Sequence, residues 1–441
     1  MAGTEASNGK YFSTLTAMPG GRVKGKVRQV IGLVIEVSGI RPFIGEICNI
    51  HSYTGETFVA EVVGFREKCA LLMPLGNLHG ISPGCVVEPT GKSFAVQVNE
   101  KLKGKVLDGL GYLLDSGHPP LKPDEGAEYP VHNNPPNPME RRPIEAILPT
   151  GVKAIDGLLT CGEGQRVGIF SGSGVGKSTL LGMIARHSES DVNVIALIGE
   201  RGREVGDFIR QDLGEEGLRR SIVVVSTSDR PALERVMGGL VAATIAEYFR
   251  DRGKKVIFMM DSVTRFCMAQ REIGLAVGEP PSTKGYTPSV FALIPRFLER
   301  SGTSSKGSIT GFYTVLVDGD DFTEPITDAV RSVLDGHIVL SRKLASQNHF
   351  PATDVLNSNS RLMLNLIEEK HNEVAAESRK LLSKYESMED LINIGAYVPG
   401  SQPEVDRAIQ KRPEIMKFLR QEPGERFELK ETINQLEKVV R

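Results

Sequence analysis

The residues with the clearest chemical potential lie between Gln165 and Leu181. Within this stretch, Ser171–Gly176 alternates glycine with other residues and is followed by Lys177 and Ser178. Closely spaced glycines let several backbone N–H groups point at one spot, and such a concave arrangement binds anions. Lys177 would reach the β- and γ-phosphates of a nucleotide, and the Ser178 hydroxyl would be a ligand for Mg²⁺. The pattern therefore predicts a phosphate-binding loop.

The residues expected to bind the phosphates run from the glycines into the first turn of the following helix. They are Gly172, Ser173, Gly174, Val175, Gly176, Lys177, Ser178 and Thr179. The strict motif starts with glycine, and this chain has Ser171 at that position. The alternative interpretation is an ordinary Gly/Ser connection between a strand and a helix. Strand, glycines, Lys-Ser and helix follow in the expected order, which favours the phosphate-binding interpretation.

Two carboxylates follow predicted buried strands. Asp261 ends the apolar run Val256–Met260, and Glu200 follows the run Val192–Ile198. Because open parallel sheets bind ligands at the carboxyl ends of their strands, we expect Asp261 to hold Mg²⁺, directly or through water. Glu200 is placed to orient or deprotonate a water molecule that attacks the γ-phosphate. A helix cap for Asp261 and a solvated charge run around Glu200 are the alternatives.

The elements that position these residues are predicted from continuous apolar runs, which are typical of parallel strands buried on both faces. After the expected strand Val167–Phe170, the runs are Val192–Ile198, Ser221–Val225, Val256–Met260 and Thr314–Val317. Helical stretches such as Pro231–Arg252 separate them. This alternation predicts a doubly wound α/β core with a parallel sheet.

Other parts of the chain have a different texture. Residues 22–92 hold short apolar runs punctuated by glycine, which predicts a small β-barrel with a structural or oligomerising role. The proline-rich passage Ser116–Pro143 is expected to be extended and to cross the surface. Strand patterns cease after Ser360, so we expect domains at 22–92, 93–360 and 361–441, the last one helical. In the remaining segment, 1–21, Tyr11–Met18 has helix-like spacing and is either an amphipathic docking segment or a frayed terminus.

The bulk composition bounds the function. The 441 residues are 40% hydrophobic and 24% charged, with a formal net charge of −2, so no global charge favours nucleic acid or an anionic membrane. The five cysteines are scattered without a Cys-x-x-Cys pair, which supports neither a disulfide framework nor a zinc site. No signal peptide and no membrane span are predicted, so we expect a cytoplasmic or peripheral protein.

Several blocks of the chain resemble the rotary-type hexameric ATPases, and within them most closely the ATPases of the bacterial flagellar export apparatus and of virulence-type (type III) secretion systems. Besides the phosphate loop, the blocks are Pro143-Ile144, Gly151–Gly157, Gly199–Glu204, Asp261–Phe266, Gln270–Leu275, Gly278–Pro281, Gly285–Phe291, Leu298–Gly302 and Gly395–Gly400. The resemblance runs from about Arg22 to the end of the chain. It implies a RecA-like core for residues 93–360.

The resemblance also implies roles for residues outside the phosphate loop. It makes Glu200 the catalytic carboxylate, with Arg201 and Glu204 supporting the phosphates and the shell of Mg²⁺. It makes Arg361 an arginine finger inserted into the neighbouring subunit's site, and Phe350 the aromatic residue that packs on adenine. ATP and Mg²⁺ are the implied ligands, and a homohexamer with shared active sites is the implied assembly.

The partners that the resemblance implies belong to an export apparatus. A coiled-coil stalk protein would be gripped in the central pore near Gly285–Leu298, and the C-terminal helices would receive export chaperones and substrates. A regulatory or stator protein would bind the N-terminal segment. The ring would associate peripherally with the membrane export gate, on the cytoplasmic face of the inner membrane.

Other functions compatible with a phosphate loop in a ring stay open on sequence alone. A rotary ATP synthase subunit is the first, and the Gly285–Phe291 block argues against it. A hexameric RNA or DNA translocase is the second, and it would need a basic barrel with exposed aromatic residues. Residues 22–89 have few aromatic residues and no dense basic run. A non-catalytic ring member is disfavoured because Lys177, Glu200, Asp261 and Arg361 are all present.

Overall fold

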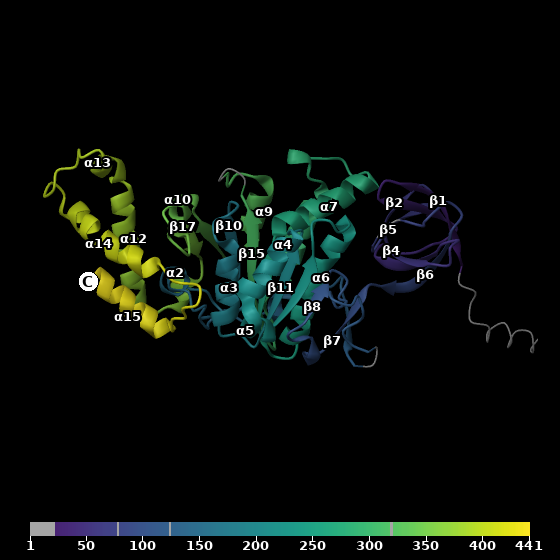
Figure 1. Ribbon diagram of the computed structural model, residues 1–441, viewed down its shortest axis with the longest axis horizontal. Helices are drawn as coiled ribbons and strands as arrows, with labels where there is room; N and C mark the ends of the chain where they lie inside the picture. The colour runs from purple at the N-terminus through teal and green to yellow at the C-terminus, as the bar shows by residue number, and fades with distance from the viewer. Residues whose placement is uncertain (1–22, 77–78, 123–124, 318–320) are drawn as a thin grey trace, which may run out of the picture. The chain divides into compact units, whose positions relative to one another are not determined.

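The computed structural model describes residues 23–76, 79–122, 125–317 and 321–441, coloured along the chain in Figure 1. The predicted amphipathic spacing of Tyr11–Met18 lies outside these residues. The chain forms two compact units. The first extends to Phe94 and includes Ala276–Gly278, and the second comprises Ala95–Leu275 and Glu279–Arg441.

The first unit contains a closed antiparallel barrel with the strand order β1-β2-β5-β4-β3-β6. The strands are β1 Gly25–Ile31, β2 Val34–Ser38, β3 Glu46–His51, β4 Thr57–Arg66, β5 Cys69–Pro74 and β6 Val86–Ser93. Inward side chains such as Ile35, Ile50 and Leu72 are fully buried and form one core. The predicted barrel is confirmed. The apolar runs did not indicate β3 and β6, because β3 alternates polar with apolar residues and β6 contains proline and glycine.

The second unit is built on a sheet with the strand order β17-β16-β10-β15-β13-β11-β12-β8. The strands are β8 Val106–Asp108, β10 Arg166–Ser171, β11 Val192–Ile198, β12 Ser221–Ser226, β13 Lys255–Asp261, β15 Ser308–Leu316, β16 Gly336–Leu340 and β17 Thr353–Ser360. All neighbours along this order are parallel except β16 and β17, and the two-residue strand β14 Gly302–Thr303 pairs antiparallel with β15. Every residue of β11 and β12 is buried, which explains their continuous apolar sequence.

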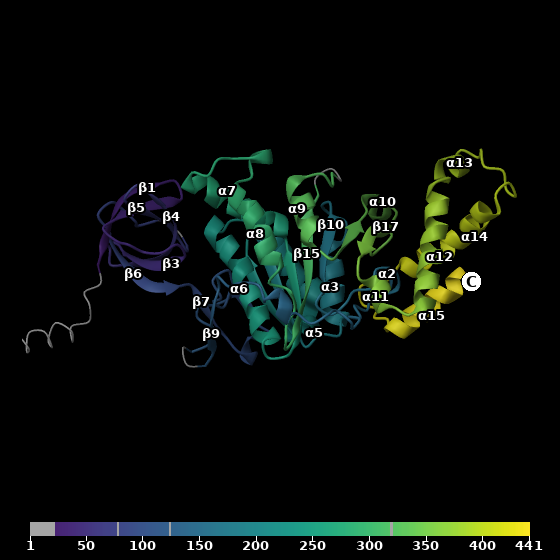
Figure 2. The same ribbon diagram turned by 180° about the vertical axis from the view of Figure 1, so that it is seen from behind.

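Helices cover both faces of this sheet, as the opposite views in Figures 1 and 2 show. They are α2 Lys153–Leu158, α3 Lys177–His187, α4 Gly202–Asp207, α5 Gly214–Arg219, α6 Ala232–Arg250, α7 Val263–Val277, α8 Pro288–Leu298, α9 Pro325–Val333 and α10 Arg342–Ser346, with a π-helical turn at Phe208–Leu213. The doubly wound α/β core is thus confirmed. The strands β16 and β17 were not predicted, because β16 is short and β17 is mostly polar.

The passage between β8 and β10 is largely loop in its described residues, as the prolines indicate. It contributes β9 Ala127–Pro130, which pairs antiparallel with β7 Ala95–Val98 in a separate two-stranded sheet, and Pro130 is its last residue. The short 3₁₀ turns Glu100–Leu102, Pro138–Glu140 and Thr283–Gly285 complete the irregular regions.

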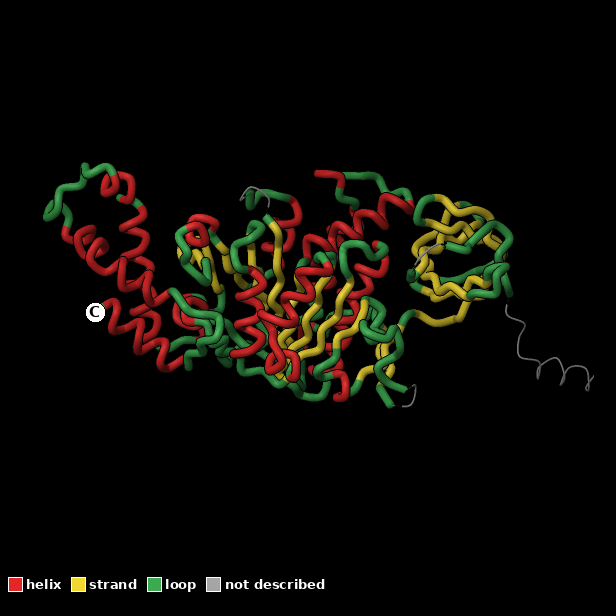
Figure 3. The backbone as a smooth tube through the Cα atoms, in the orientation of Figure 1, coloured by secondary structure: helices red, strands yellow, loops and turns green. Residues whose placement is uncertain are grey.

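The chain after Ser360 is helical, as Figure 3 shows in red. It forms α11 Met363–Leu366, α12 Glu369–Glu386, α13 Glu389–Asn393, α14 Pro403–Leu419 and α15 Leu429–Val440. Val374 and Leu381 of α12 are buried in a hydrophobic core that continues into the sheet. Among the described residues, no helix is long and apolar enough to cross a membrane.

Candidate active site

The predicted phosphate loop connects the carboxyl end of β10, which lies between β16 and β15 in the sheet, to α3. Gly174 and Gly176 have φ angles of +75° and +86°, in the left-handed region that glycine adopts without a steric penalty. Helix α3 begins directly after Gly176, at Lys177, so its first backbone N–H groups face the loop. The local backbone is therefore suited to an anion.

Ser171 shows why glycine is not needed at the first motif position. It is still part of β10, where it pairs with Leu316 on one side and Leu340 on the other. Its backbone is extended, and its small side chain is 2% exposed. A residue in a strand needs no positive φ, so serine fits here without strain.

Three charged side chains converge beside the loop. The Lys177 ammonium group contacts the Asp261 carboxylate and lies 3.6 Å from Glu200 Oε1. Asp261 is the last residue of β13, and Glu200 follows β11, so adjacent parallel strands bring the two carboxylates together. The Thr314 hydroxyl from β15 donates a 2.8 Å hydrogen bond to Asp261 Oδ1 and orients it.

Burial and neighbouring charges shift the pKa values of Glu200 and Lys177. Burial raises the pKa of Glu200 to about 7, with Lys177 opposing the rise and Asp261 adding to it. Burial disfavours the charged form of Lys177, but the carboxylates of Asp261 and Glu200 outweigh it, so the pKa of Lys177 is raised. Lys177 is therefore a cation, and Glu200 holds its proton far more readily than an exposed glutamate does.

The cluster borders a cavity of about 500 Å³. The predicted site residues that line it are Gly172, Ser173, Gly174, Gly176, Lys177, Ser178, Thr179, Glu200, Arg201, Glu204 and Asp261. The side chains of Arg201 and Glu204 are exposed and pair with each other at 3.4 Å at its rim. The side chain of Val175 is 2% exposed and packs into the hydrophobic core. Only its backbone can serve a ligand.

Besides Val175, two residues predicted at the nucleotide site do not line this cavity. The Phe350 ring lies against the loop, since a Cβ added at Gly176 would be 3.2 Å from it. Arg361 follows the last residue of β17, and its backbone N–H donates to the carbonyl of Asp335, just before β16. Because β17 runs antiparallel to β16, Arg361 lies at the amino ends of the parallel strands, opposite the loop of its own subunit.

The oxygen donors at the cavity suit Mg²⁺. Ser178 and Asp261 offer a hydroxyl and a carboxylate at the end of the phosphate loop, and Glu204 lies at the rim. Within the described ranges, no group of three His, Cys, Asp or Glu side chains could hold a metal by itself. Such a sparse set matches Mg²⁺, which takes one or two protein oxygens and completes its shell with phosphates and water.

Sequence reasoning missed two residues at this site. Thr314 holds Asp261, and Arg265 lines the cavity with its buried Nε lacking a hydrogen-bond partner among the described residues. Arg265 stands four positions after Asp261, in the first turn of α7. Its spacing from Asp261 could have indicated that Arg265 lies at the site. Thr314 could not be found in this way, because its strand β15 is adjacent to β13 in the sheet but far from it in sequence.

Family models match most of the chain. The nucleotide-binding domain of the ATP synthase alpha/beta family matches residues 151–360, and the β-barrel domain of that family matches residues 27–91. The T3SS EscN ATPase C-terminal domain matches residues 367–438. The last match separates the chain from ATP synthase subunits, because it belongs to secretion ATPases.

Curated relatives are similar over nearly their full lengths. The chain is 56% identical to the flagellum-specific ATP synthase of Bacillus subtilis over 93% of each chain. It is 50% identical to the type 3 secretion system ATPase of Xanthomonas euvesicatoria over 92% of each chain.

Among solved structures, the assembled ATPase EscN of the enteropathogenic E. coli type III secretion system matches with a TM-score of 0.88 and 45% identity. That match covers 95% of this chain and 100% of the EscN chain. The phosphate loop, the converging Lys177, Glu200 and Asp261, and these similarities lead to one conclusion. The chain belongs to the family of flagellum-specific ATP synthases and type 3 secretion system ATPases, and it is an ATPase.

Proposed function

We propose that this ATPase requires Mg²⁺ and drives or assists protein export by a flagellar apparatus, as a ring whose active sites are shared between subunits. The observation that supports it most directly is the convergence of Lys177, Glu200 and Asp261 at the end of the phosphate loop. Phosphoryl transfer to water needs charge neutralisation and a positioned water molecule more than covalent chemistry, and these side chains are of the types that supply both.

Each side chain has one role in the proposed reaction. The loop N–H groups and Lys177 bind the β- and γ-phosphates, and Glu200 orients the attacking water and accepts its proton. Mg²⁺, when bound, neutralises phosphate charge, and Ser178 and Asp261 would hold it, with Glu204 supporting its water shell. Arg201 supports the phosphates from the rim, and Phe350 packs on the adenine ring.

Arg361 does not line the cavity beside the phosphate loop of its own subunit. Arg361 is separated from the phosphate loop by the length of β16, which at about 3.3 Å per residue is roughly 16 Å. Its side chain is exposed. We therefore assign Arg361 to the site of the adjacent subunit, where an arginine finger contributes about 10³- to 10⁵-fold in rate.

The proposed assembly is a homohexamer that grips a coiled-coil stalk protein in its pore. The support is that EscN was solved both assembled and in complex with its central stalk EscO, the latter matching with a TM-score of 0.86. Residues 22–92 serve oligomerisation, 93–360 hold the ATPase site, and 361–441 receive export chaperones and substrates. The ring acts at the cytoplasmic face of the membrane export gate, where a regulatory or stator protein binds it.

The hydrolytic site is tested with the Lys177→Ala variant of the full chain. It should lose ATP hydrolysis, because the phosphates lose their main protein cation, and hydrolysis at the unmutated rate would refute the site. The shared site is tested by mixing Lys177→Ala subunits with Arg361→Ala subunits. Some interfaces then combine an intact loop with an intact finger, so hydrolysis should return. No recovery in rings verified to be mixed would refute the trans role of Arg361.

The flagellar role is tested by deleting the gene. Loss of motility with effector secretion intact is the expected result, and loss of effector secretion with motility intact would move the protein to a virulence-type system. The relatives include both kinds of ATPase at 50% identity or more. RNA-stimulated hydrolysis would instead revive a nucleic-acid translocase.

A further inference from the structure

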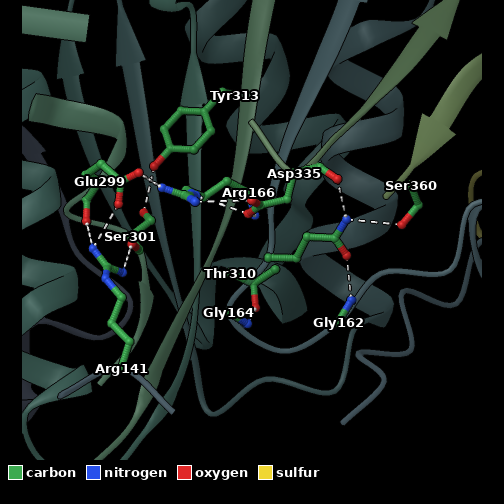
Figure 4. Close-up of polar contacts among 11 residues, drawn as sticks. Arg141, Gly162, Gly164, Arg166, Glu299, Ser301, Thr310, Tyr313, Asp335 and Ser360 are labelled. Atoms are coloured by element: carbon green, nitrogen blue, oxygen red, sulfur yellow. Dashed lines mark hydrogen bonds and ion pairs between the residues drawn. The ribbon is translucent and has the colours of Figure 1, made fainter. Parts of the chain in front are cut away.

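A polar network occupies the amino ends of the parallel strands, opposite the phosphate loop. Figure 4 shows its side chains converging from strands β10, β15 and β17 and from the segments next to them. Its members are Arg141, Gln165, Arg166, Glu299, Ser301, Tyr313, Asp335 and Ser360. None of them belongs to the catalytic cluster, but the network adjoins Arg361.

The centre of the network is a two-pronged ion pair. Arg166 Nε and Nη2 donate to the two carboxylate oxygens of Asp335 at 3.0 and 3.1 Å. The backbone N–H of Arg166 donates to the same carboxylate at 3.0 Å, and the backbone N–H of Asp335 donates to the Arg166 carbonyl at 2.9 Å. Four hydrogen bonds between two residues fix the Asp335 peptide firmly against the start of β10.

The other side of Asp335 holds the end of β17. Its carbonyl oxygen accepts a 3.0 Å hydrogen bond from the backbone N–H of Arg361 and a 3.3 Å bond from Gln165 Nε2. Gln165 Nε2 also donates to Ser360 Oγ at 3.1 Å, and Ser360 Oγ donates to the Thr160 carbonyl. Gln165 is fully buried. The peptide that joins Ser360 to Arg361 is therefore held on both sides.

Glu299 and Arg141 make further contacts that hold Arg166 in place. Arg166 also pairs with Glu299, the residue that follows α8. Arg141 donates to Glu299 Oε2 at 3.1 Å and to the Ser301 carbonyl at 2.8 Å. The Arg166 guanidinium is thus clamped between two carboxylates and cannot rotate without breaking one of its contacts.

We propose that Asp335 and Arg166 are positioning residues for Arg361. They fix the point and the direction at which Arg361 leaves β17 toward the neighbouring subunit. No carboxylate among the described residues pairs with the Arg361 guanidinium, so its placement depends on its backbone. A catalytic group displaced by about 1 Å can lose about 10²-fold in rate. The inference rests on the proposed trans role of Arg361 and assigns the residues that make it work.

The test must separate this role from a structural one, because Arg166 lies in the strand that leads to its own phosphate loop. A defect in finger positioning acts on the neighbour's site, whereas a defect in β10 acts on the subunit's own site. The Asp335→Asn variant removes the carboxylate with almost no change in shape. We expect its kcat to fall at least about 10-fold, with unchanged affinity for a fluorescent ATP analogue.

The deciding measurement is hydrolysis by rings mixed from Asp335→Asn and Lys177→Ala subunits of the full chain. With random mixing, about one interface in four joins an intact loop to a correctly placed finger, so activity should rise well above that of either variant alone. Arg166→Lys, which keeps the charge but not the two-pronged bond, should show a smaller loss, and mixing should raise its activity only if that activity has fallen below about one third of the unmutated value. It serves as the second variant if Asp335→Asn is poorly folded.

Two controls make the outcome unambiguous. Glu272 pairs with Arg235 at 2.7 Å, and neither residue belongs to the network around Arg361. Glu272→Gln removes this ion pair and should leave kcat unchanged. Arg361→Ala mixed with Lys177→Ala tests the trans finger itself. Wild-type turnover by Asp335→Asn overturns the inference. The inference is also overturned if mixing with Lys177→Ala subunits restores the activity of Arg361→Ala but not that of Asp335→Asn. If mixing fails for Arg361→Ala as well, the proposed function is at fault and the inference falls with it.

Discussion

At the carboxyl ends of the central strands Lys177 faces two carboxylates, Glu200 and Asp261, whereas at the amino ends each carboxylate of the network is met by arginine. The first arrangement borders a cavity and leaves buried polar atoms, such as Glu200 Oε1, without hydrogen bonds among the described residues. In the second, Arg166 forms ion pairs with Asp335 and Glu299, and Arg141 pairs with Glu299. We call the carboxyl ends of the strands the open edge of the sheet, because a ligand can bind there. We call the amino ends the closed edge, because their charged side chains pair with one another.

This contrast explains how the same fold serves both catalysis and assembly. An open edge can bind charge because its own groups are imperfectly paired, and that imperfection lowers the stability of the free protein. A closed edge can hold an exposed residue in a fixed place for another subunit. Substitutions at the carboxyl ends should therefore affect catalysis most, and substitutions at the amino ends should affect stability and the placement of Arg361.

The first prediction concerns catalysis at the open edge. Glu200→Gln should lower ATP turnover by roughly 10² to 10⁴, because an amide cannot accept the proton of the attacking water. Binding of a fluorescent ATP analogue should be retained, since the loop and Lys177 remain. Phosphate release under saturating ATP measures the loss, with Glu215→Gln, an exposed glutamate of α5, as the matched control. Turnover within a few-fold of the unmutated protein would remove Glu200 from the mechanism.

The second prediction concerns stability beside the closed edge. Arg300 pairs with Glu247 at 2.8 Å, with side chains 3% and 0% exposed, and also donates to Thr244 Oγ1. Arg300→Met should lower the free energy of unfolding by about 3 to 5 kcal/mol, because it leaves a buried carboxylate unpaired. Lys177→Met should cost much less, since its carboxylate partners face a cavity that water can enter. If urea unfolding gave equal losses of unfolding free energy for the two variants, the two edges would not differ in their contribution to stability.

Much of the open edge could be predicted because its signals are local. The phosphate loop, Asp261 and Glu200 each come within two residues of the end of an apolar run, so strand and chemistry are visible in one stretch. The cavity also shows the limit of that reasoning. Val175 belongs to the motif, yet its side chain turns into the core, and the orientation of a side chain depends on packing that the motif does not contain.

The closed edge could not be predicted, for a physical reason. Arg166 and Asp335 are 169 positions apart and meet only because β16 pairs with β10. Of the two strands that create the meeting with Arg361, β16 is short, and β17 carries polar residues such as Asn357 and Asn359 that mask its pattern. Contacts set by strand order leave no mark in a local window.

The third prediction returns to Glu200, now for stability without nucleotide or Mg²⁺. Because burial raises its pKa to about 7, the folded state pays for ionisation at pH 8, and protonation relieves that cost as the pH falls below 7. Glu200→Gln should therefore be more stable than the unmutated protein at pH 8, by about 2 kcal/mol, with the difference shrinking toward pH 5. Thermal unfolding at both pH values measures it. If Glu200→Gln were less stable than the unmutated protein at pH 8, the ionised Glu200 carboxylate would not destabilise the folded state.

The smallest predicted effect concerns His349, beside Phe350. It is 1% exposed, and its Nδ1 accepts a 3.2 Å hydrogen bond from Arg420 Nε. Burial, aided by Arg420 and Arg412, lowers its pKa to about 4. The folded protein thus keeps it neutral while the unfolded chain protonates it, so its stability contribution is present above pH 6.5 and lost as the pH falls toward 4.

His349→Asn keeps an acceptor near the position of Nδ1 but cannot titrate. The unmutated protein should lose about 1 kcal/mol more than this variant between pH 7 and pH 5, measured by urea unfolding without nucleotide. Parallel pH profiles would mean that His349 gains a proton in the folded protein as readily as in the unfolded chain. Arg420 would then have to turn away from the ring, because a protonated Nδ1 cannot accept its hydrogen bond, and the support beneath Phe350 would differ from the contact seen here.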